Sequence, residues 1–97
     1  MESDLVTLEE YSIHYKVESF FVEELGELGL IRIIQKEEKK YIPFESLPEL
    51  ESYSRMFYEL DINTAGIDAI HNLLNRIRTL QEEMTELRNR LRFYEIE

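Results

Sequence analysis

Two histidines and twenty-one carboxylates are the side chains of this sequence best suited to chemistry. His14 and His71 are residue types that bind metals or transfer protons, but neither has a second ligand at the short spacing that metal sites use. The carboxylates recur along expected helical faces and do not gather around an apolar cleft, which indicates a solvated surface. The absence of cysteine excludes disulfides, thiolate zinc sites and cysteine nucleophiles. We therefore expect no catalytic residue, no metal site, no cofactor and no enzyme activity.

The overall charge limits the kinds of partner. The chain has 21 acidic and 11 basic residues and a net charge of −10, so a generic surface would repel both nucleic acid and anionic membranes. Its three glycines are too few and too scattered for a glycine-rich phosphate loop. Apolar runs are far shorter than the roughly 20 residues that cross a bilayer, and the first residues lack a basic signal-peptide region. We expect a cytoplasmic protein whose partner is basic.

The first elements predict a helix-turn-helix. Thr7 and Glu10 form a capping box, which begins a short helix that runs to about Tyr15. A second helix is expected over residues 19–28, with Gly29 as its stop signal. Its apolar residues lie on one buried face: Phe21, Val22, Leu25 and Leu28.

The next segment predicts a wing, which is a hairpin that follows the helix-turn-helix. Two runs of β-branched and aromatic residues, 30–35 and 40–44, flank a charged tip. Pro43 is expected to restrict the second strand to a sheet edge. Ser46 and Glu49 form a second capping box, with Pro48 in the first helical turn. The helix that they open is expected to bury Leu50, Tyr53, Phe57 and Leu60, with Met56 on the flank.

The last helix carries the clearest pattern in the sequence. Asn63 is its expected N-cap. Its apolar residues keep spacings of 3 and 4 over eight successive heptad positions: Ile70, Leu73, Ile77, Leu80, Met84, Leu87, Leu91 and Tyr94. Such a narrow stripe indicates a helix that pairs with a second helix, so we expect a coiled-coil homodimer. The competing interpretation is a helix that lies along its own head domain.

The flanking charges of this helix bear on the orientation of the dimer. In a parallel pair, Glu83 faces Arg88 of the partner subunit, and Arg90 faces the partner subunit's Glu95. Each exposed pair contributes less than about 1 kcal/mol, so these pairs select orientation more than they stabilise.

The chain therefore divides into two expected parts of a mainly α protein. Residues 1–62 form a winged helix-turn-helix head with 6 basic and 15 acidic side chains, a net of −9. Residues 63–97 form the heptad-repeat helix with 5 basic and 6 acidic side chains, a net of −1. The head is thus the part that a basic partner would contact.

Residues 17–31 read V-E-S-F-F-V-E-E-L-G-E-L-G-L-I. They resemble the segment of MerR-type winged-helix proteins in which a V-S-x-x-x-L-R-Y-Y-E-R-L-G-L-L pattern carries the recognition helix. DNA-binding members place an arginine and a tyrosine against the phosphate backbone, whereas this chain has Glu23 and Glu24, and Glu27 occupies a further basic position. These three and Phe20 recur at i, i+3, i+4 and i+7, on the face opposite the buried one. An acidic recognition helix is repelled by DNA, although ordinary solvated glutamates would produce the same pattern.

A branch of the MerR-like proteins shares further features with this chain. Residues 59–67 read E-L-D-I-N-T-A-G-I and precede a leucine-rich helix that runs through Leu91 and Phe93. This stretch, together with Tyr41 and Phe44 before the third helix, is similar to the chaperone modulator CbpM family. That resemblance implies a homodimer that binds the J-domain of a DnaJ-like co-chaperone of the CbpA type. It also implies inhibition, by competition with the DnaK-type chaperone for the same J-domain surface.

Phe20, Glu23, Glu24 and Glu27 are the expected partner-binding residues, because an aromatic residue ringed by charge is a common interface anchor. The other candidate faces are the wing tip and the third helix, where Glu45, Glu49 and Glu51 form a second acidic group. Two other functions stay open. One is a DNA-binding regulator that uses the cations of the wing: Arg32, Lys36, Lys39 and Lys40. The other is an adaptor whose coiled coil joins a larger assembly. MerR-type dimers usually cross antiparallel, so the dimer orientation also stays open.

Overall fold

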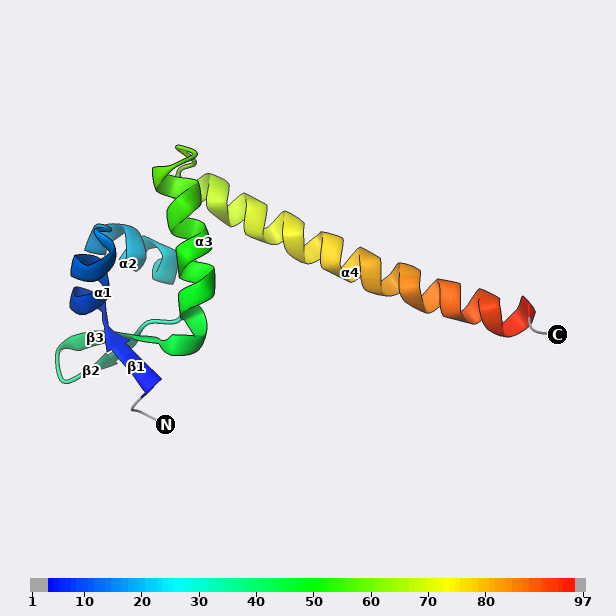
Figure 1. The fold of residues 1–97 in the computed structure, drawn as a ribbon, viewed down its shortest axis with the longest axis horizontal. Helices are drawn as coiled ribbons and strands as arrows, with labels where there is room; N and C mark the ends of the chain where they lie inside the picture. The colour runs from blue at the N-terminus through cyan, green and yellow to red at the C-terminus, as the bar shows by residue number, and fades with distance from the viewer. Residues whose placement is uncertain (1–3, 96–97) are drawn as a thin grey trace.

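The computed structural model describes residues 4–95 and consists of a small head from which one long helix projects (Figure 1). The longest dimension of the molecule is 63 Å, against 35 and 20 Å for the other two. Residues 1–3 and 96–97, at the outer ends of the two expected domains, lie outside the described residues. The elements are β1 (Leu5–Thr7), α1 (Leu8–Tyr15), α2 (Ser19–Glu27), β2 (Ile34–Lys36), β3 (Lys39–Pro43), the 3-10 helix η2 (Phe44–Ser46), α3 (Leu47–Tyr58) and α4 (Thr64–Glu95).

Helix α1 begins and ends where its sequence predicts. The Thr7 hydroxyl accepts a hydrogen bond of 3.0 Å from the Glu10 N–H, so the predicted capping residue is confirmed. After Tyr15 the chain turns at Lys16, which has a left-handed φ of 57°. This turn brings α2 back across α1 and forms the helix-turn-helix.

Helix α2 is anchored in the core by Phe21, Val22 and Leu25, all fully buried. It ends at Glu27, and Gly29 has a φ of 78°, which confirms the predicted stop signal. The prediction that Leu28 shares the buried face is wrong: its side chain is 43% exposed, because the helix has ended and the chain turns there. Gly26 has a packing role, since a Cβ at this position would lie 2.6 Å from Cδ1 of Ile33.

The wing, formed by β2 and β3, belongs to a three-stranded antiparallel sheet with the order β1-β3-β2. The hairpin is confirmed, with a first strand shorter than predicted, a second strand of the predicted length and a two-residue turn at Glu37 and Glu38. Both turn residues have positive φ, 49° and 69°. The prediction that Pro43 marks an edge strand is wrong, because β1 pairs with β3 and makes it the central strand. Pro43 is tolerated as the last residue of β3.

The predicted capping box at the start of α3 is wrong, because α3 follows directly from η2. Ser46 makes no side-chain capping bond, and its backbone (φ −87°, ψ −10°) is already helical, whereas a cap residue is extended. Pro48 lies in the first turn as predicted. Leu50 and Tyr53 are buried and Phe57 is half-buried, but Leu60 is 65% exposed because α3 ends at Tyr58.

The head and the first turns of α4 share one hydrophobic core. Its buried members are Leu8, Tyr11, Val17, Phe21, Val22, Leu25, Leu30, Ile31, Ile42, Leu50, Tyr53 and Ile67. Ile67 comes from α4, whose start is capped as predicted: Asn63 Oδ1 accepts a 2.8 Å hydrogen bond from the Gly66 N–H. One turn later, Nδ1 of His71 lies 2.9 Å from the Tyr53 hydroxyl. Beyond these contacts α4 leaves the head (Figure 1).

Across residues 4–95, every helix is too short or too polar to serve as a membrane-crossing segment.

Candidate protein-binding surfaces

The α2 outer face consists of Phe20, Glu23, Glu24 and Glu27, on the side of α2 away from the core. Phe20 is 55% exposed, and Glu24 and Glu27 are exposed as well. Within residues 4–95, neither Glu24 nor Glu27 forms an ion pair. An exposed aromatic ring therefore lies on the same helix face as two carboxylates that are available to a partner.

Glu23 differs from the other two glutamates of this face, because its carboxylate lies 3.1 Å from the ammonium group of Lys40 on β3. The two side chains are only 38% and 39% exposed. The pair links α2 to the wing, so Glu23 has a structural partner within the head and Glu24 and Glu27 carry the unpaired negative charge of the surface.

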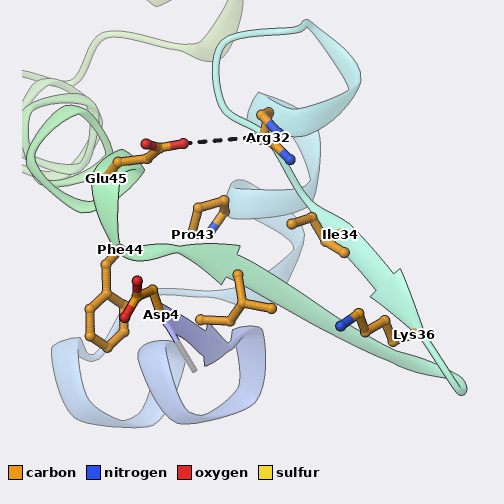
Figure 2. Close-up of a pocket in the computed structure, with 8 residues that line it drawn as sticks. Asp4, Arg32, Ile34, Lys36, Pro43, Phe44 and Glu45 are labelled. Carbon is orange, nitrogen blue, oxygen red and sulfur yellow. Dashed lines mark ion pairs between the residues drawn. The ribbon is translucent and has the colours of Figure 1, made fainter. Parts of the chain in front are cut away.

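A second pair occurs at the base of the wing, where Arg32 lies 3.5 Å from Glu45 (Figure 2). The pair lies at one end of an open depression (Figure 2), whose volume is about 550 Å³. The depression is lined by Asp4, Leu5, Arg32, Ile34, Lys36, Pro43, Phe44 and Glu45. Two of the four wing cations, Arg32 and Lys40, thus have carboxylate partners within the head.

The second acidic group is largely engaged by neighbouring cations. Glu45 pairs with Arg32, and Glu51 lies 3.8 Å from Arg55 one turn along α3. Only Glu49 of this group lacks an ion pair among the described residues. The α2 outer face therefore has more unpaired carboxylates than this second acidic group.

The apolar stripe of α4 comprises the eight predicted heptad positions. Ile70, nearest the head, is half-buried. The other seven are between 49% and 73% exposed: Leu73, Ile77, Leu80, Met84, Leu87, Leu91 and Tyr94. The alternative in which this helix lies along its own head is wrong, because α4 projects away from the head (Figure 1). So long an exposed apolar surface is typical of interaction sites.

The two histidines occupy different environments. His71 lies between Tyr53 and Asn75. The Nε2 atom of His71 is 3.2 Å from Nδ2 of Asn75. His14 is exposed and contacts the ring of Tyr15 edge-on. In the described part of the chain, no three His, Asp or Glu side chains cluster as metal ligands would. Burial raises the pKa of the Tyr11 and Tyr53 phenols, so both keep their protons well into the alkaline range.

A further surface was missed at the sequence level: a cleft between the end of α1 and α3, which Tyr11, Tyr15 and Tyr58 line. Tyr11 and Tyr15 are four residues apart and so share a helix face. This spacing is the one local signal in the sequence that could have indicated the cleft. The third ring comes from a residue 43 positions beyond Tyr15. Only the tertiary fold shows that Tyr58 lines the same cleft as the other two tyrosines.

A family model described as a MerR HTH family regulatory protein matches residues 6–89, which span the head and most of α4. No curated protein and no solved structure gives a significant match to the chain.

Proposed function

The chain belongs to the MerR HTH family of regulatory proteins, and we propose that within this family it is a non-enzymatic chaperone modulator of the CbpM type. In this proposal it binds the J-domain of a DnaJ-like co-chaperone of the CbpA type. Binding inhibits the co-chaperone, because the protein competes with the DnaK-type chaperone for the same J-domain surface.

The charge of the α2 outer face is the observation that supports this proposal most. In the MerR resemblance, α2 is the helix that approaches DNA, yet its unpaired charges are the carboxylates of Glu24 and Glu27. Contacts to DNA gain affinity by neutralising phosphates, and carboxylates neutralise none. A basic helix, such as a J-domain presents, is attracted to the same face. Complementary charge accelerates the encounter and selects the partner.

Phe20 is the proposed apolar anchor of this contact. Its ring is 55% exposed on the same face as the two free carboxylates. Interfaces draw most of their affinity from a few large side chains that become buried, and surrounding polar groups exclude water and set specificity. Phe20 has this arrangement. Glu23 contributes mainly by holding the wing against α2 through Lys40.

The apolar stripe of α4 supports the homodimer that forms part of the proposal. Burying a leucine or isoleucine side chain contributes about 1.5–3 kcal/mol, and most positions of the stripe are exposed in the single chain. A second copy brings an identical stripe with the same heptad spacing. The dimer therefore carries two α2 outer faces.

DNA binding by a MerR-like transcriptional regulator is the second candidate function, favoured by the description of the family as regulatory and by the exposed Lys39 of the wing. An electrophoretic mobility shift experiment at low salt distinguishes the two candidates. We expect no retarded DNA at micromolar protein. Retarded DNA that is released by added salt would favour the regulator.

A competition experiment tests the proposed function. A fluorescently labelled J-domain of a CbpA-type co-chaperone is first bound to its DnaK-type chaperone, and this protein is then added. We expect the labelled J-domain to leave the chaperone as it enters a new complex, and added salt to reduce the displacement. Formation of a ternary complex would rule out competition for one surface, and an unchanged signal would contradict J-domain binding.

A further inference from the structure

We propose that the contact surface for the basic partner extends from the α2 outer face onto α1, where Ile13 is a second apolar anchor and Glu9 and Glu10 are further carboxylates. The α1–α2 surface is the α2 outer face together with these three residues. Its occupant is one basic amphipathic helix of the partner protein. The identity of that partner rests on the proposed function, and the inclusion of α1 in the contact goes beyond it.

Ile13 is the most exposed large apolar side chain in the described part of the head. It is 72% exposed, against 65% for Leu60 and 55% for Phe20. It belongs neither to the hydrophobic core nor to the half-buried side chains that pack against the core. The fold of the single chain therefore makes no use of its apolar surface, and a partner that covers Ile13 gains the free energy of removing that surface from water.

The α2 outer face and the outer side of α1 meet in one continuous surface. Glu9 on α1 and Glu23 on α2 line the same depression, which lies between the two helices and the wing and has a volume of about 310 Å³. Ile13 lies one helical turn after Glu9, and Phe20 lies one turn before Glu23, so each apolar side chain shares a helix face with one of these carboxylates. A single partner element can therefore reach both anchors.

The two halves of this surface are held in fixed positions before a partner arrives. The hydroxyl oxygens of Ser12 on α1 and Ser19 on α2 are 3.0 Å apart and share a hydrogen bond. Val17, in the turn that joins the helices, is buried in the core. A preorganised surface loses little conformational freedom on binding, which favours affinity.

The charge of the two helices favours a basic occupant. Residues 8–27 contain six acidic side chains and one basic side chain, Lys16, a net charge of −5. One of the six is balanced by the wing lysine with which it pairs, which leaves −4. Glu9 and Glu10 are exposed, and neither forms an ion pair within residues 4–95. This field attracts a positively charged partner and repels nucleic acid and anionic membranes.

A basic amphipathic helix has the pattern that complements this surface. Its apolar stripe can cover Ile13 and Phe20, while the cations on both sides of the stripe meet the carboxylates that lie one turn from each anchor. The apolar contacts slow dissociation, and the complementary charges accelerate the encounter. Contact with α2 alone would leave Ile13 and the carboxylates of α1 unused.

Isothermal titration calorimetry of the full chain with an isolated CbpA-type J-domain tests the role of Ile13. We expect Ile13→Ser to weaken binding at least about fivefold, as the loss of an interface anchor does. Leu60→Ser is the matched control, because Leu60 is also an exposed aliphatic residue of the head but lies outside the α1–α2 surface. Unchanged affinity of Ile13→Ser would overturn the extension onto α1 and leave the proposed function standing. No binding by the unaltered protein would overturn both.

Two further measurements separate this contact from general charge and from self-association. Glu9→Gln combined with Glu10→Gln should weaken binding about two- to fivefold at low salt and less at high salt. Glu82→Gln combined with Glu86→Gln makes the same change in charge on α4 and should have no effect, so equal effects of the two double variants would overturn the inference. Analytical ultracentrifugation should give Ile13→Ser the same mass as the unaltered protein. A lower mass would assign Ile13 to a contact between copies of this chain and would also overturn the inference.

Discussion

The wing turn contains two residues in a conformation that their side chains disfavour. Glu37 and Glu38 have φ values of 49° and 69°, in the left-handed region where glycine and asparagine are preferred. A residue with a Cβ loses about 1–2 kcal/mol there. The wing therefore keeps strain that a single substitution can remove.

Glu38→Gly should raise the free energy of unfolding by about 0.5–1 kcal/mol, since the released strain exceeds the extra chain entropy of glycine. Urea denaturation followed by circular dichroism measures the change. Gln35→Gly is the control, because Gln35 is the exposed middle residue of β2 and glycine weakens a strand interior. A lower stability for Glu38→Gly than for the unaltered protein would contradict the assignment of strain.

Two buried phenols make stability depend on alkaline pH. Burial is the main cause that raises the pKa of Tyr11 and Tyr53 above the ordinary value of 10.0, and nearby Glu49 adds to the shift for Tyr53. Above pH 10 the unfolded phenols lose protons that the folded ones keep, so the free energy of unfolding falls as the pH rises further. Tyr11→Phe combined with Tyr53→Phe should flatten this fall. Urea midpoints at pH 8 and pH 10.5 measure it, and an identical slope in the double variant would contradict the account.

At the residue scale, interactions within a few positions were predictable and distant ones were not. Thr7 and Asn63 cap helices through backbone groups three residues away, so their sequences identified them. The pairing of Glu23 with Lys40 was not predictable, because it depends on how the wing packs against α2. The same holds for the cleft that Tyr11, Tyr15 and Tyr58 line.

Helix α4 depends on its first turn for attachment to the head. The Asn63 side chain caps the Gly66 N–H, and Ile67 is fully buried in the core. Most of the helix beyond this point is exposed in the single chain. The cap, the buried isoleucine and the contact of His71 with Tyr53 therefore hold the start of α4 against the head.

Asn63→Ala should lower the free energy of unfolding by about 1 kcal/mol, the usual effect of losing an N-cap side chain. Asn72→Ala provides the matched control, since Asn72 is exposed within α4 and alanine is the better helix former. Chemical denaturation of both variants gives the comparison. Equal stabilities would show that the cap contributes nothing to the attachment of α4.

At the element scale, long periodic segments were predictable and short ones were not. The sequence predicted α1, α2, the wing, α3 and α4 by type and approximate position. It missed β1, which has three residues. Without β1, the strand that contains Pro43 was wrongly predicted to lie at the sheet edge. Leu28 and Leu60 continue the apolar period of their helices, but both helices end before them and leave these side chains exposed.

The whole molecule has the shape of a head on a long projecting helix, which a single chain leaves largely uncovered (Figure 1). The match to the MerR HTH family confirms the MerR-like architecture that the sequence predicted. The dimer, its orientation and the J-domain partner remain proposals, because heptad spacing identifies a contact surface without identifying what covers it.

Leu80→Glu combined with Met84→Glu should convert the proposed dimer into a monomer, since four carboxylates would then meet at the centre of the paired stripes. Analytical ultracentrifugation at several concentrations measures the mass. Arg78→Glu, on the same helix but outside the heptad stripe, should leave the dimer intact. Sedimentation of the unaltered protein as a monomer at tens of micromolar would contradict self-association through α4.

The affinity of the full chain for an isolated CbpA-type J-domain, measured by isothermal titration calorimetry, tests the central claim most directly. We expect the unaltered protein to bind, and Glu24→Lys combined with Glu27→Lys to bind at least about tenfold more weakly, a loss of about 1.4 kcal/mol. Glu82→Lys combined with Glu86→Lys changes the net charge equally on α4 and should bind like the unaltered protein. Equal affinities for the two double variants would remove the α2 outer face as the contact surface, and no heat of binding from the unaltered protein would contradict the account as a whole.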